Sequence, residues 1–381
     1  MTAPQGSGSR DRRAVTQVIS VVVAVILLSL VIWRVTDRNL SDDTSEGRCD
    51  ADKARTEVRG IIGSEKEPFF KDKRVAARFA CAGLTVTADP RGSRDMVAAL
   101  GTAPHAYQFA FPASTPTAEK IKKVMSVTDQ FTPFSSPMAV ATFEPIVGLL
   151  ARAGVVQRTS ADNWVVDVAE LLKLARAGTR WDQLPDNAEY PVRNAVLLRT
   201  TDPRDSSSAI MFLSIASQVA NNGAVVTTED QLQRVMPDLC RLVFDQGTKP
   251  ETSQVLFNYY VNDGMGRIPM ALIYESQFLT EAPGQKPALG SDQVLVFPKP
   301  TVYSRHTLLP FEAAGRRVGQ LLRDDPELRR LAEEYGFRLE GRPFRSRPAP
   351  IDVVEAPSYE LLETMLNQLE PTPDNARRCA K

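Results

Sequence analysis

Several turns in this sequence combine serine hydroxyls with cationic side chains, the groups that hold small polar or anionic molecules. The first turn, at residues 63–66, follows an apolar run and reads Gly-Ser-Glu-Lys. Ser64 is a favourable N-cap residue and Pro68 fits the first turn of a helix, so we expect a helix to begin here. Its free backbone N–H groups and the positive end of its dipole would face whatever occupies the turn.

The same arrangement recurs further along the chain. Residues 84–89 alternate like a strand and lead into Arg-Gly-Ser-Arg at 91–94, and residues 107–111 lead into a turn that contains Ser114. A fourth polar turn, at 202–208, enters an apolar helix. In a parallel sheet the carboxyl ends of the strands lie along one edge, where open α/β sheets bind ligands. Ordinary helix capping is the alternative explanation for each serine.

The sequence offers little for catalysis. Its two histidines, His105 and His306, are far apart, and neither stands in a metal-ligand pattern. It contains no Gly-x-Ser-x-Gly elbow, Walker A motif or Gly-x-Gly-x-x-Gly motif. We therefore expect a protein that is not an enzyme and has no cofactor and no metal site. Lys66, Arg94 and Arg204 offer charge-assisted hydrogen bonds to an oxyanion or a carboxylate, although solvated surface charges would look the same.

Length and composition indicate a globular protein of up to two domains. The chain has 381 residues, of which 43% are hydrophobic, and its 46 basic and 46 acidic side chains cancel. A chain of this size buries a core large enough to fold unaided. Because the net charge is zero, no general attraction to nucleic acid is expected.

One segment near the N-terminus is long and apolar enough to cross a membrane. Residues 14–33 contain no charged side chain, and a helix needs about 20 apolar residues to span a bilayer. Arg10, Arg12 and Arg13 precede the segment, so the positive-inside rule places the N-terminus in the cytoplasm. We expect an uncleaved single-pass signal anchor in the cell membrane, with the bulk of the chain extracytoplasmic. A cleaved signal peptide is the alternative.

The four cysteines fit an exported chain, which meets oxidising conditions. Cys49 lies just before the first expected strand and Cys81 at the end of the helix that returns beneath it, which favours a bond between them. Cys240 would then attach the C-terminal tail at Cys379. Free buried thiols are the alternative. No Cys-x-x-Cys spacing occurs, which excludes a zinc ribbon or a thioredoxin-type motif.

The order of expected elements indicates a sheet with helices on both faces. Strands alternate with helices over residues 58–111, which is typical of a parallel sheet. Residues 131–141 form an extended run with two prolines that fits a crossover between two lobes. The helix-rich remainder is expected to contain three strands and two closing helices, at residues 192–200, 268–274, 293–297, 308–322 and 326–335.

These features resemble a type II periplasmic binding protein, the two-lobed extracellular solute-binding fold. The resemblance covers residues 58–337 and rests on five local motifs, at residues 63–66, 91–94, 111–114, 135–137 and 202–208. The turns Gly-Ser-Glu-Lys and Phe-Pro-x-Ser are also similar to those of substrate-binding-like proteins of actinobacterial envelopes, some of which are fused to von Willebrand A modules.

The resemblance implies an α/β fold of two lobes, with parallel-core sheets and helices on both faces, in addition to the N-terminal transmembrane helix. It divides the chain into seven segments. They are a cytoplasmic tail (1–13), a transmembrane signal anchor (14–36), an extracytoplasmic tether (37–57), the first part of lobe 1 (58–138), lobe 2 (139–290), the return to lobe 1 (291–340), and a C-terminal strap and tail (341–381).

The resemblance further implies non-catalytic capture of a small polar ligand, with anions among the candidates, in the cleft between the lobes. The expected ligand-binding residues are Ser64, Lys66, Ser93, Arg94, Ser114, Ser136, Arg204, Ser206, Ser207 and Tyr274. An ABC permease or another envelope protein is the expected partner. Two features depart from the family. Its members are usually secreted free or lipid-anchored, whereas this chain is expected to be held by a transmembrane helix. In addition, Glu65 and Glu67 place negative charge beside the first turn, which is unfavourable for an anionic ligand. The alternative function is a cell-envelope interaction or scaffold protein that binds a protein or cell-wall partner with the same fold.

Overall fold

The computed structural model describes residues 55–159, 163–203, 205–341, 352–370, 372, 375 and 379, without the side chain of Ser93. The chain divides into two compact units, residues 1–53 and 54–381, and the elements below all belong to the second. The predicted membrane anchor at 14–36 lies outside the described residues. Within those residues, no helix has both the length and the apolar character that a bilayer crossing requires.

Lobe 1 is built on three parallel strands, β1 (Thr56–Gly63), β2 (Leu84–Arg91) and β3 (Phe109–Phe111). β1 lies between the other two and pairs with both. As predicted, each strand leads into helix at its carboxyl end. The helical elements of this lobe are η1 (Ser64–Lys66), α2 (Glu67–Lys71), α3 (Lys73–Cys81), α4 (Ser93–Thr102), α5 (Thr115–Met125), α12 (Ala313–Asp324) and α13 (Pro326–Glu334).

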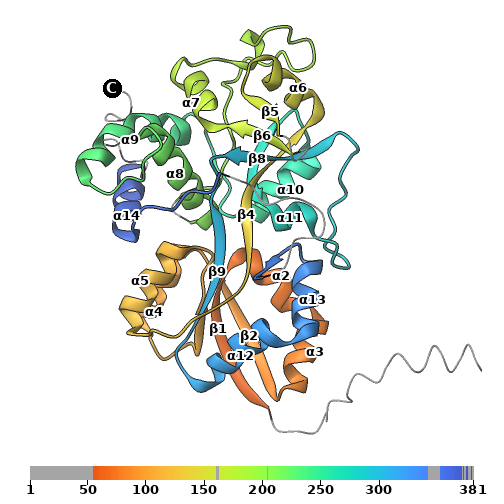
Figure 1. Cartoon of the computed structure of the whole chain (residues 1–381), viewed down its shortest axis with the longest axis vertical. Helices are drawn as coiled ribbons and strands as arrows, with labels where there is room; N and C mark the ends of the chain where they lie inside the picture. Colours follow the sequence, from red (N-terminus) through yellow and green to blue (C-terminus); the bar gives the residue numbers. More distant parts are fainter. Residues whose placement is uncertain are drawn as a thin grey trace, which may run out of the picture. The chain divides into compact units, whose positions relative to one another are not determined.

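Two long strands, β4 (Phe131–Phe143) and β9 (Tyr303–Pro310), connect lobe 1 to lobe 2 (Figure 1). β4 pairs antiparallel with β9 as far as Pro137, and beyond it with strands of lobe 2. Pro133 falls in the irregular register between Phe131 and Phe134, where the missing N–H disturbs no ladder hydrogen bond. β9 also pairs antiparallel with β3, so the sheet is mixed rather than parallel throughout.

Lobe 2 surrounds the second half of β4 with four further strands and a layer of helices. α8 is apolar on nearly all sides and is buried from Ser207 to Ser217, as expected of a helix inside a core. The strands of lobe 2 are β5 (Val156–Arg158), β6 (Trp164–Asp167), β7 (Met270–Tyr274) and β8 (Gln293–Lys299). Its helical elements are α6 (Glu144–Arg152), α7 (Val168–Arg176), η2 (Trp181–Gln183), α8 (Ser207–Ala220), α9 (Glu229–Phe244), α10 (Ser253–Asp263) and α11 (Glu275–Leu279).

Separate apolar cores define the two lobes. A cluster of aromatic rings fills lobe 1, in which Phe134 stacks on Phe337 at 4.5 Å between ring centroids. The core of lobe 2 also takes in apolar side chains of α14 (Tyr359–Gln368) near the C-terminus. A short strand, β10 (Arg338–Leu339), returns from α13 to pair with β4. Each lobe therefore folds around its own core while sharing the crossover strands.

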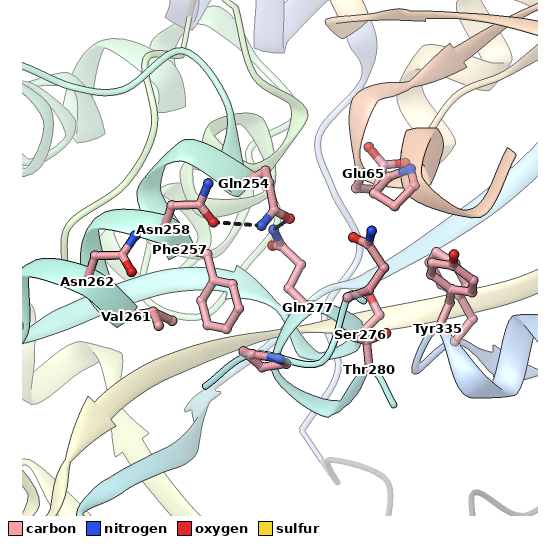
Figure 2. Close-up of a pocket in the computed structure, with 14 residues that line it drawn as sticks. Glu65, Gln254, Phe257, Asn258, Val261, Asn262, Ser276, Gln277, Thr280 and Tyr335 are labelled. Atoms are coloured by element: carbon pink, nitrogen blue, oxygen red, sulfur yellow. Dashed lines mark hydrogen bonds between the residues drawn. The ribbon is translucent and has the colours of Figure 1, made fainter. Parts of the chain in front are cut away.

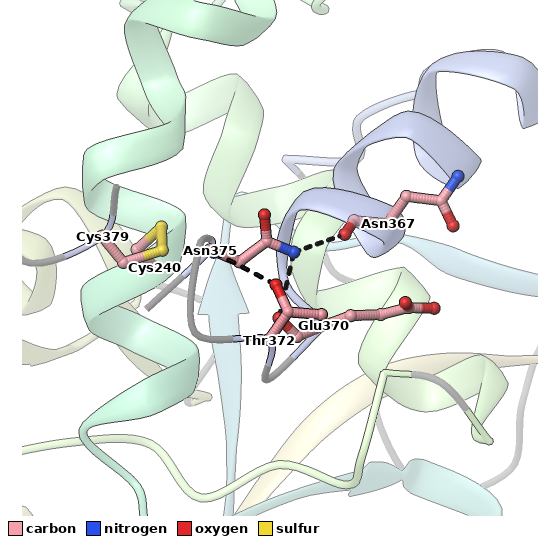
Figure 3. The surroundings of a disulfide bond; sticks show 6 residues. All are labelled: Cys240, Asn367, Glu370, Thr372, Asn375 and Cys379. Carbon is pink, nitrogen blue, oxygen red and sulfur yellow. Dashed lines mark hydrogen bonds between the residues drawn. A yellow bond between two sulfur atoms is a disulfide. The ribbon is translucent and has the colours of Figure 1, made fainter. Parts of the chain in front are cut away.

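The disulfides follow the predicted pairing where the structure describes them. Cys240 on α9 is bonded to Cys379, which confirms the prediction that the C-terminal tail is attached at Cys240 (Figure 3). Cys81 is also disulfide-bonded. Its predicted partner, Cys49, lies outside the described residues, so the identity of that bond stays a prediction.

Three predicted boundaries are wrong. Residues 192–200 form no regular strand in the described chain, because only Ala195 and Arg199 make isolated bridges while the apolar residues between them are buried in the core. The helix expected at 308–322 begins only at Ala313, because the alternating residues before it continue β9. β8 pairs with β4 and β6 in lobe 2, so the return to lobe 1 starts at β9 and not at residue 291.

Candidate functional site

A cluster of buried polar side chains lies where β1 ends beside the crossover strands. Lys66 on η1 is fully buried, and its Nζ donates to the carboxylate of Glu65. The same Nζ lies 3.1 Å from Nδ1 of His306 on β9. On the other side of the ring, Nε2 of His306 is 3.1 Å from Oγ of Ser304, which donates to the carbonyl of Ala113 at 2.6 Å. The cluster thus joins the ends of β1 and β3 to β9.

Burial determines the charge of this cluster. It lowers the pKa of Lys66, although the adjacent carboxylate of Glu65 acts in the opposite direction. Burial also lowers the pKa of His306 to well below 6.5, and the positive charge of Lys66 adds to that shift. The imidazole is therefore neutral near pH 7, and the ammonium group is balanced by one carboxylate. The cluster satisfies its own charges and needs no external anion.

His306 makes the protein sensitive to mild acid. A buried base with a lowered pKa binds fewer protons in the folded than in the unfolded state, so stability is present at high pH and is lost as the pH falls through about 6.5. We expect the free energy of unfolding to fall by up to about 1.4 kcal/mol per pH unit below that value. Urea unfolding of the full chain at a series of pH values measures the slope. The variant His306→Gln should reduce this pH dependence, whereas His105→Gln, which changes an exposed histidine, should not. If the wild type and both variants have equal slopes, His306 is not the group responsible.

Three described serines of the predicted site are used by the fold itself. Ser64, which was expected to cap a helix, does not do so, because the cap residue of η1 is Gly63. Ser114 caps α5, with its Oγ accepting a hydrogen bond from a backbone N–H of the first turn. Oγ of Ser136 accepts from the backbone N–H of Ser276 at 3.1 Å and so joins β4 to α11. Ser206 caps α8, with its Oγ accepting from the N–H of Ser208. These hydroxyls therefore have structural partners.

The structure gathers only part of the predicted set around β9. Lys66 contacts His306, Ser136 is the cross-strand neighbour of Ser304, and the ring of Tyr274 lies 6.4 Å from that of His306. The hydroxyl of Tyr274 is buried without a hydrogen-bond partner among the described residues, and burial raises its pKa. The remaining predicted residues are placed as follows. Ser64 is half-buried at the start of η1, Ser207 is buried at the start of α8, and the side chain of Ser93 and all of Arg204 lie outside the description.

Arg94 lies against the C-terminal helix and not beside Lys66. Its guanidinium donates to the carboxylate of Glu363 at 3.1 Å, to Asn367 at 2.8 Å and to Glu370 at 3.3 Å. Because α14 packs its apolar side into the core of lobe 2, these bonds link α4 of lobe 1 to lobe 2. Arg94 therefore holds the lobes together at their outer side.

The lobes meet closely along the serine-bearing turns. A Cβ atom at Gly92, before α4, would lie 1.9 Å from the carbonyl oxygen of Asp205, before α8. Near the crossover strands, the buried carboxylate of Glu275 on α11 accepts two hydrogen bonds from Arg338 on β10, at 2.6 and 2.7 Å. No space is left between the lobes at Gly92, so a ligand site has to lie elsewhere along their interface.

Such a site lies beside Glu65, on the side where η1 and α2 face α10 and α11. The interface there encloses a cavity of about 130 Å³. Figure 2 shows Gln254, Asn258 and Asn262 along α10, with Glu65 contributed by lobe 1. Apart from these, the lining residues are Pro68, Tyr335 and Phe337 from lobe 1 and Phe257, Val261, Ser276, Gln277, Thr280, Gln285 and Pro287 from lobe 2.

Carboxamides dominate the polar part of this cavity. The backbone N–H of Tyr274 donates to Gln277, which donates to Gln254 at 3.1 Å, which in turn donates to Asn258 at 3.0 Å. Gln254, Asn258 and Asn262 follow one another at intervals of four residues and so lie on one face of α10. This spacing is visible in the sequence, but it does not by itself indicate a binding site, because polar residues at that interval usually form a solvated helix face.

The electrostatics of the cavity do not favour an anion. Among its lining residues Glu65 is the only one with a charge, and no arginine or lysine is present. Phe257, Phe337 and Pro68 supply apolar wall between the polar groups. A wider cavity of about 510 Å³ shares Pro68, Gln285 and Tyr335 with it. That cavity is lined by charges of both signs, those of Glu67, Lys71, Asp72, Lys73 and Arg74.

Comparison with known proteins gives a consistent answer for the fold. A substrate-binding protein of an ABC transporter from Agrobacterium tumefaciens has a TM-score of 0.54 and 13% identity, over 87% of this chain and 96% of that one. The periplasmic binding protein AfuA from Actinobacillus pleuropneumoniae, with fructose-6-phosphate bound, has a TM-score of 0.52 and 11% identity, over 83% and 97%. The fold is that of a type II periplasmic binding protein. The predicted resemblance is thereby confirmed.

The sulfate-binding protein SubI from Mycobacterium tuberculosis H37Rv shares this binding-protein fold, with a TM-score of 0.50 and 14% identity over 81% of this chain and 96% of that one. No protein-family model and no curated protein matches the sequence. In the described part of the chain, no group of three or more His, Cys, Asp or Glu side chains gathers that could hold a metal ion. The narrower resemblance to actinobacterial envelope proteins stays a prediction.

Proposed function

We propose that the chain is an extracytoplasmic solute-binding protein that holds a small, neutral, hydroxyl-rich molecule in the interlobe cavity. The observation that supports this proposal is a wall with five carboxamides and no cationic side chain. Carboxamides both donate and accept, which suits hydroxyl groups, and Phe257 and Phe337 suit the C–H faces of such a molecule. Among the residues that line this cavity, an anion would meet only one charge, the carboxylate of Glu65. The proposed ligand is therefore small and polar, as the resemblance implies, but is not one of the anions that were among the candidates.

We further propose that the chain is held at the outer surface of the cell membrane by residues 14–33. Their apolar length and the arginines before them support this placement. The proposed tether, which ends before β1 begins at Thr56, would keep the lobes near the membrane. An ABC permease or another envelope protein would receive the ligand there. Catalysis is not part of the proposal, because the polar residues of the cavity include no paired acid and base.

The ligand class can be tested by thermal unfolding of the full chain with a panel of neutral sugars and polyols and their phosphorylated counterparts. A ligand that binds only the folded state raises the unfolding temperature by mass action. We expect a neutral compound to do so and its phosphorylated form to do so less. Gln254→Leu removes one carboxamide and should weaken binding about threefold to tenfold, the loss of one or two net hydrogen bonds.

Gln233→Leu is the matched control for that variant. Gln233, like Gln254, is an exposed glutamine that donates to a residue four positions away on its helix, but it lies on α9 away from the cavity. The Gln233→Leu variant should bind the neutral compound with the same affinity as the wild type. Absence of stabilisation by every neutral compound, or equal binding by Gln254→Leu, would contradict the proposal. That outcome would favour the envelope interaction protein, which the occupied serine turns and the lobe-linking α14 also support.

A further inference from the structure

A second cavity, of about 380 Å³, lies entirely within lobe 2 and shares no lining residue with the interlobe cavity. It is enclosed by η2, the segment after it, the C-terminal end of α9 and the residues before β7. Three arginines line it, Arg193, Arg199 and Arg267, together with a single carboxylate, that of Asp245. The lining is therefore rich in positive charge, in contrast to the cavity between the lobes.

Arg199 is held firmly in this cavity, and the part of the chain that the structure describes gives it no counter-ion. Its backbone bonds to β7 on both sides, donating to Met270 at 3.0 Å and accepting from Leu272 at 2.9 Å. Its guanidinium donates from Nη2 to the carbonyl of Thr248, while Nε is buried and has no hydrogen-bond partner among the described residues. No carboxylate in the described chain forms an ion pair with it. Burial lowers its pKa, and the charge of Arg267 adds to that effect.

The neighbouring groups bring two further arginines to the cavity, each beside a carboxylate. Arg267 is fixed by an ion pair with Asp263 at 2.6 Å and by its position 4.2 Å above the ring of Tyr259. The buried rings of Trp181 and Tyr190 contact each other at the floor, with 5.3 Å between their centroids. A buried N–H without an acceptor and two adjacent cations are both unfavourable, and a bound anion would relieve both.

We propose that this cavity binds an oxyanion, the carboxylate or phosphate group of a small molecule, between Arg199 and Arg267. An oxygen of the anion supplies the acceptor that Nε of Arg199 lacks, and the planar guanidinium favours a two-pronged grip. Arg193, which is 82% exposed at the rim, lies 3.8 Å from the carboxylate of Asp182, so the proposed grip rests on Arg199 and Arg267. The site is separate from the proposed solute cavity and takes the opposite charge class of ligand.

Thermal unfolding of the full chain in inorganic phosphate, in citrate and in chloride at matched ionic strength tests the site. We expect phosphate, citrate or both to raise the unfolding temperature above the chloride value. If only one of the two anions stabilises the protein, that result shows whether the site prefers a phosphate or a carboxylate group. Arg199→Met and Arg267→Met should each weaken anion binding at least about tenfold, since each removes a charge-assisted hydrogen bond. Arg317→Met, an exposed arginine on α12, is the control and should respond as the wild type does.

Arg199→Met also provides a readout that a purely structural arginine would not give. Without anion it should be no less stable than the wild type, because it removes a partly buried charge that has no counter-ion. Absence of stabilisation by both anions, or an undiminished response in both arginine variants, would overturn the proposal. Gln254→Leu, in the interlobe cavity, should leave the anion response unchanged, which separates this site from the proposed function.

Discussion

Replacing both cysteines of the C-terminal disulfide, Cys240→Ser with Cys379→Ser, is expected to lower the free energy of unfolding by about 4–5 kcal/mol. The bond connects residues 139 positions apart, so its loss releases a long loop in the unfolded chain. Urea unfolding of the full chain under non-reducing conditions measures the change. A loss below about 1 kcal/mol would show that the bond adds little to the contacts already made by α14.

The same disulfide bears on how the lobes are held together. α14 packs Leu362, Met365 and Leu366 into the core of lobe 2, while Glu363 pairs with Arg94 of lobe 1. In Figure 3, Asn375 donates to the carbonyls of Asn367 and Glu370. Because the disulfide ends this segment on α9, its removal should also loosen the link between the lobes. Faster amide hydrogen exchange in α14 would report that loosening.

Breaking the buried ion pair between the lobes is the second change with a large expected effect. Arg338→Met should destabilise the protein by about 3–5 kcal/mol, because it leaves the carboxylate of Glu275 buried without its cation. Burial alone would lower the pKa of Arg338, but the hydrogen bonds to Glu275 outweigh it and the pKa is raised. Chemical denaturation of the full chain is again the measurement.

Two further variants separate the ion pair from simple loss of a side chain. Replacing both partners, Glu275→Met with Arg338→Met, should restore most of the lost stability, because no charge is then left unpaired. Arg323→Met breaks the exposed pair with Asp324 and should have a much smaller effect. A double variant as unstable as Arg338→Met would mean that packing at this position, rather than charge, accounts for the loss.

Sequence patterns predicted the elements whose signals are local. The alternation of strands and helices over residues 58–111, the extended crossover at 131–141 and the helix near 326–335 all appear close to their expected positions. The segment at 192–200 was mistaken for a strand because a short apolar run fits a strand and a buried loop equally well. Which of the two forms depends on β7, a partner distant in the sequence.

The site was harder to predict because its residues meet only in three dimensions. Serines before helices serve as caps and as ligand contacts with the same sequence pattern, and the structure shows Ser114 and Ser206 as caps. In the sequence, the amides of α10 have the spacing of a solvated helix face. In the structure, they line the same cavity as Glu65. Likewise nothing local shows that Glu275 and Arg338 pair, because 63 positions separate them in the sequence.

Crystallographic analysis of the chain with a neutral compound that raises its unfolding temperature tests the central claim most directly. The expected result is ligand density between α10 and η1, with its hydroxyl groups in hydrogen-bond contact with Gln254 and Gln277. Density on another surface, or an interlobe cavity that holds only water while the compound is bound elsewhere, would contradict the assignment.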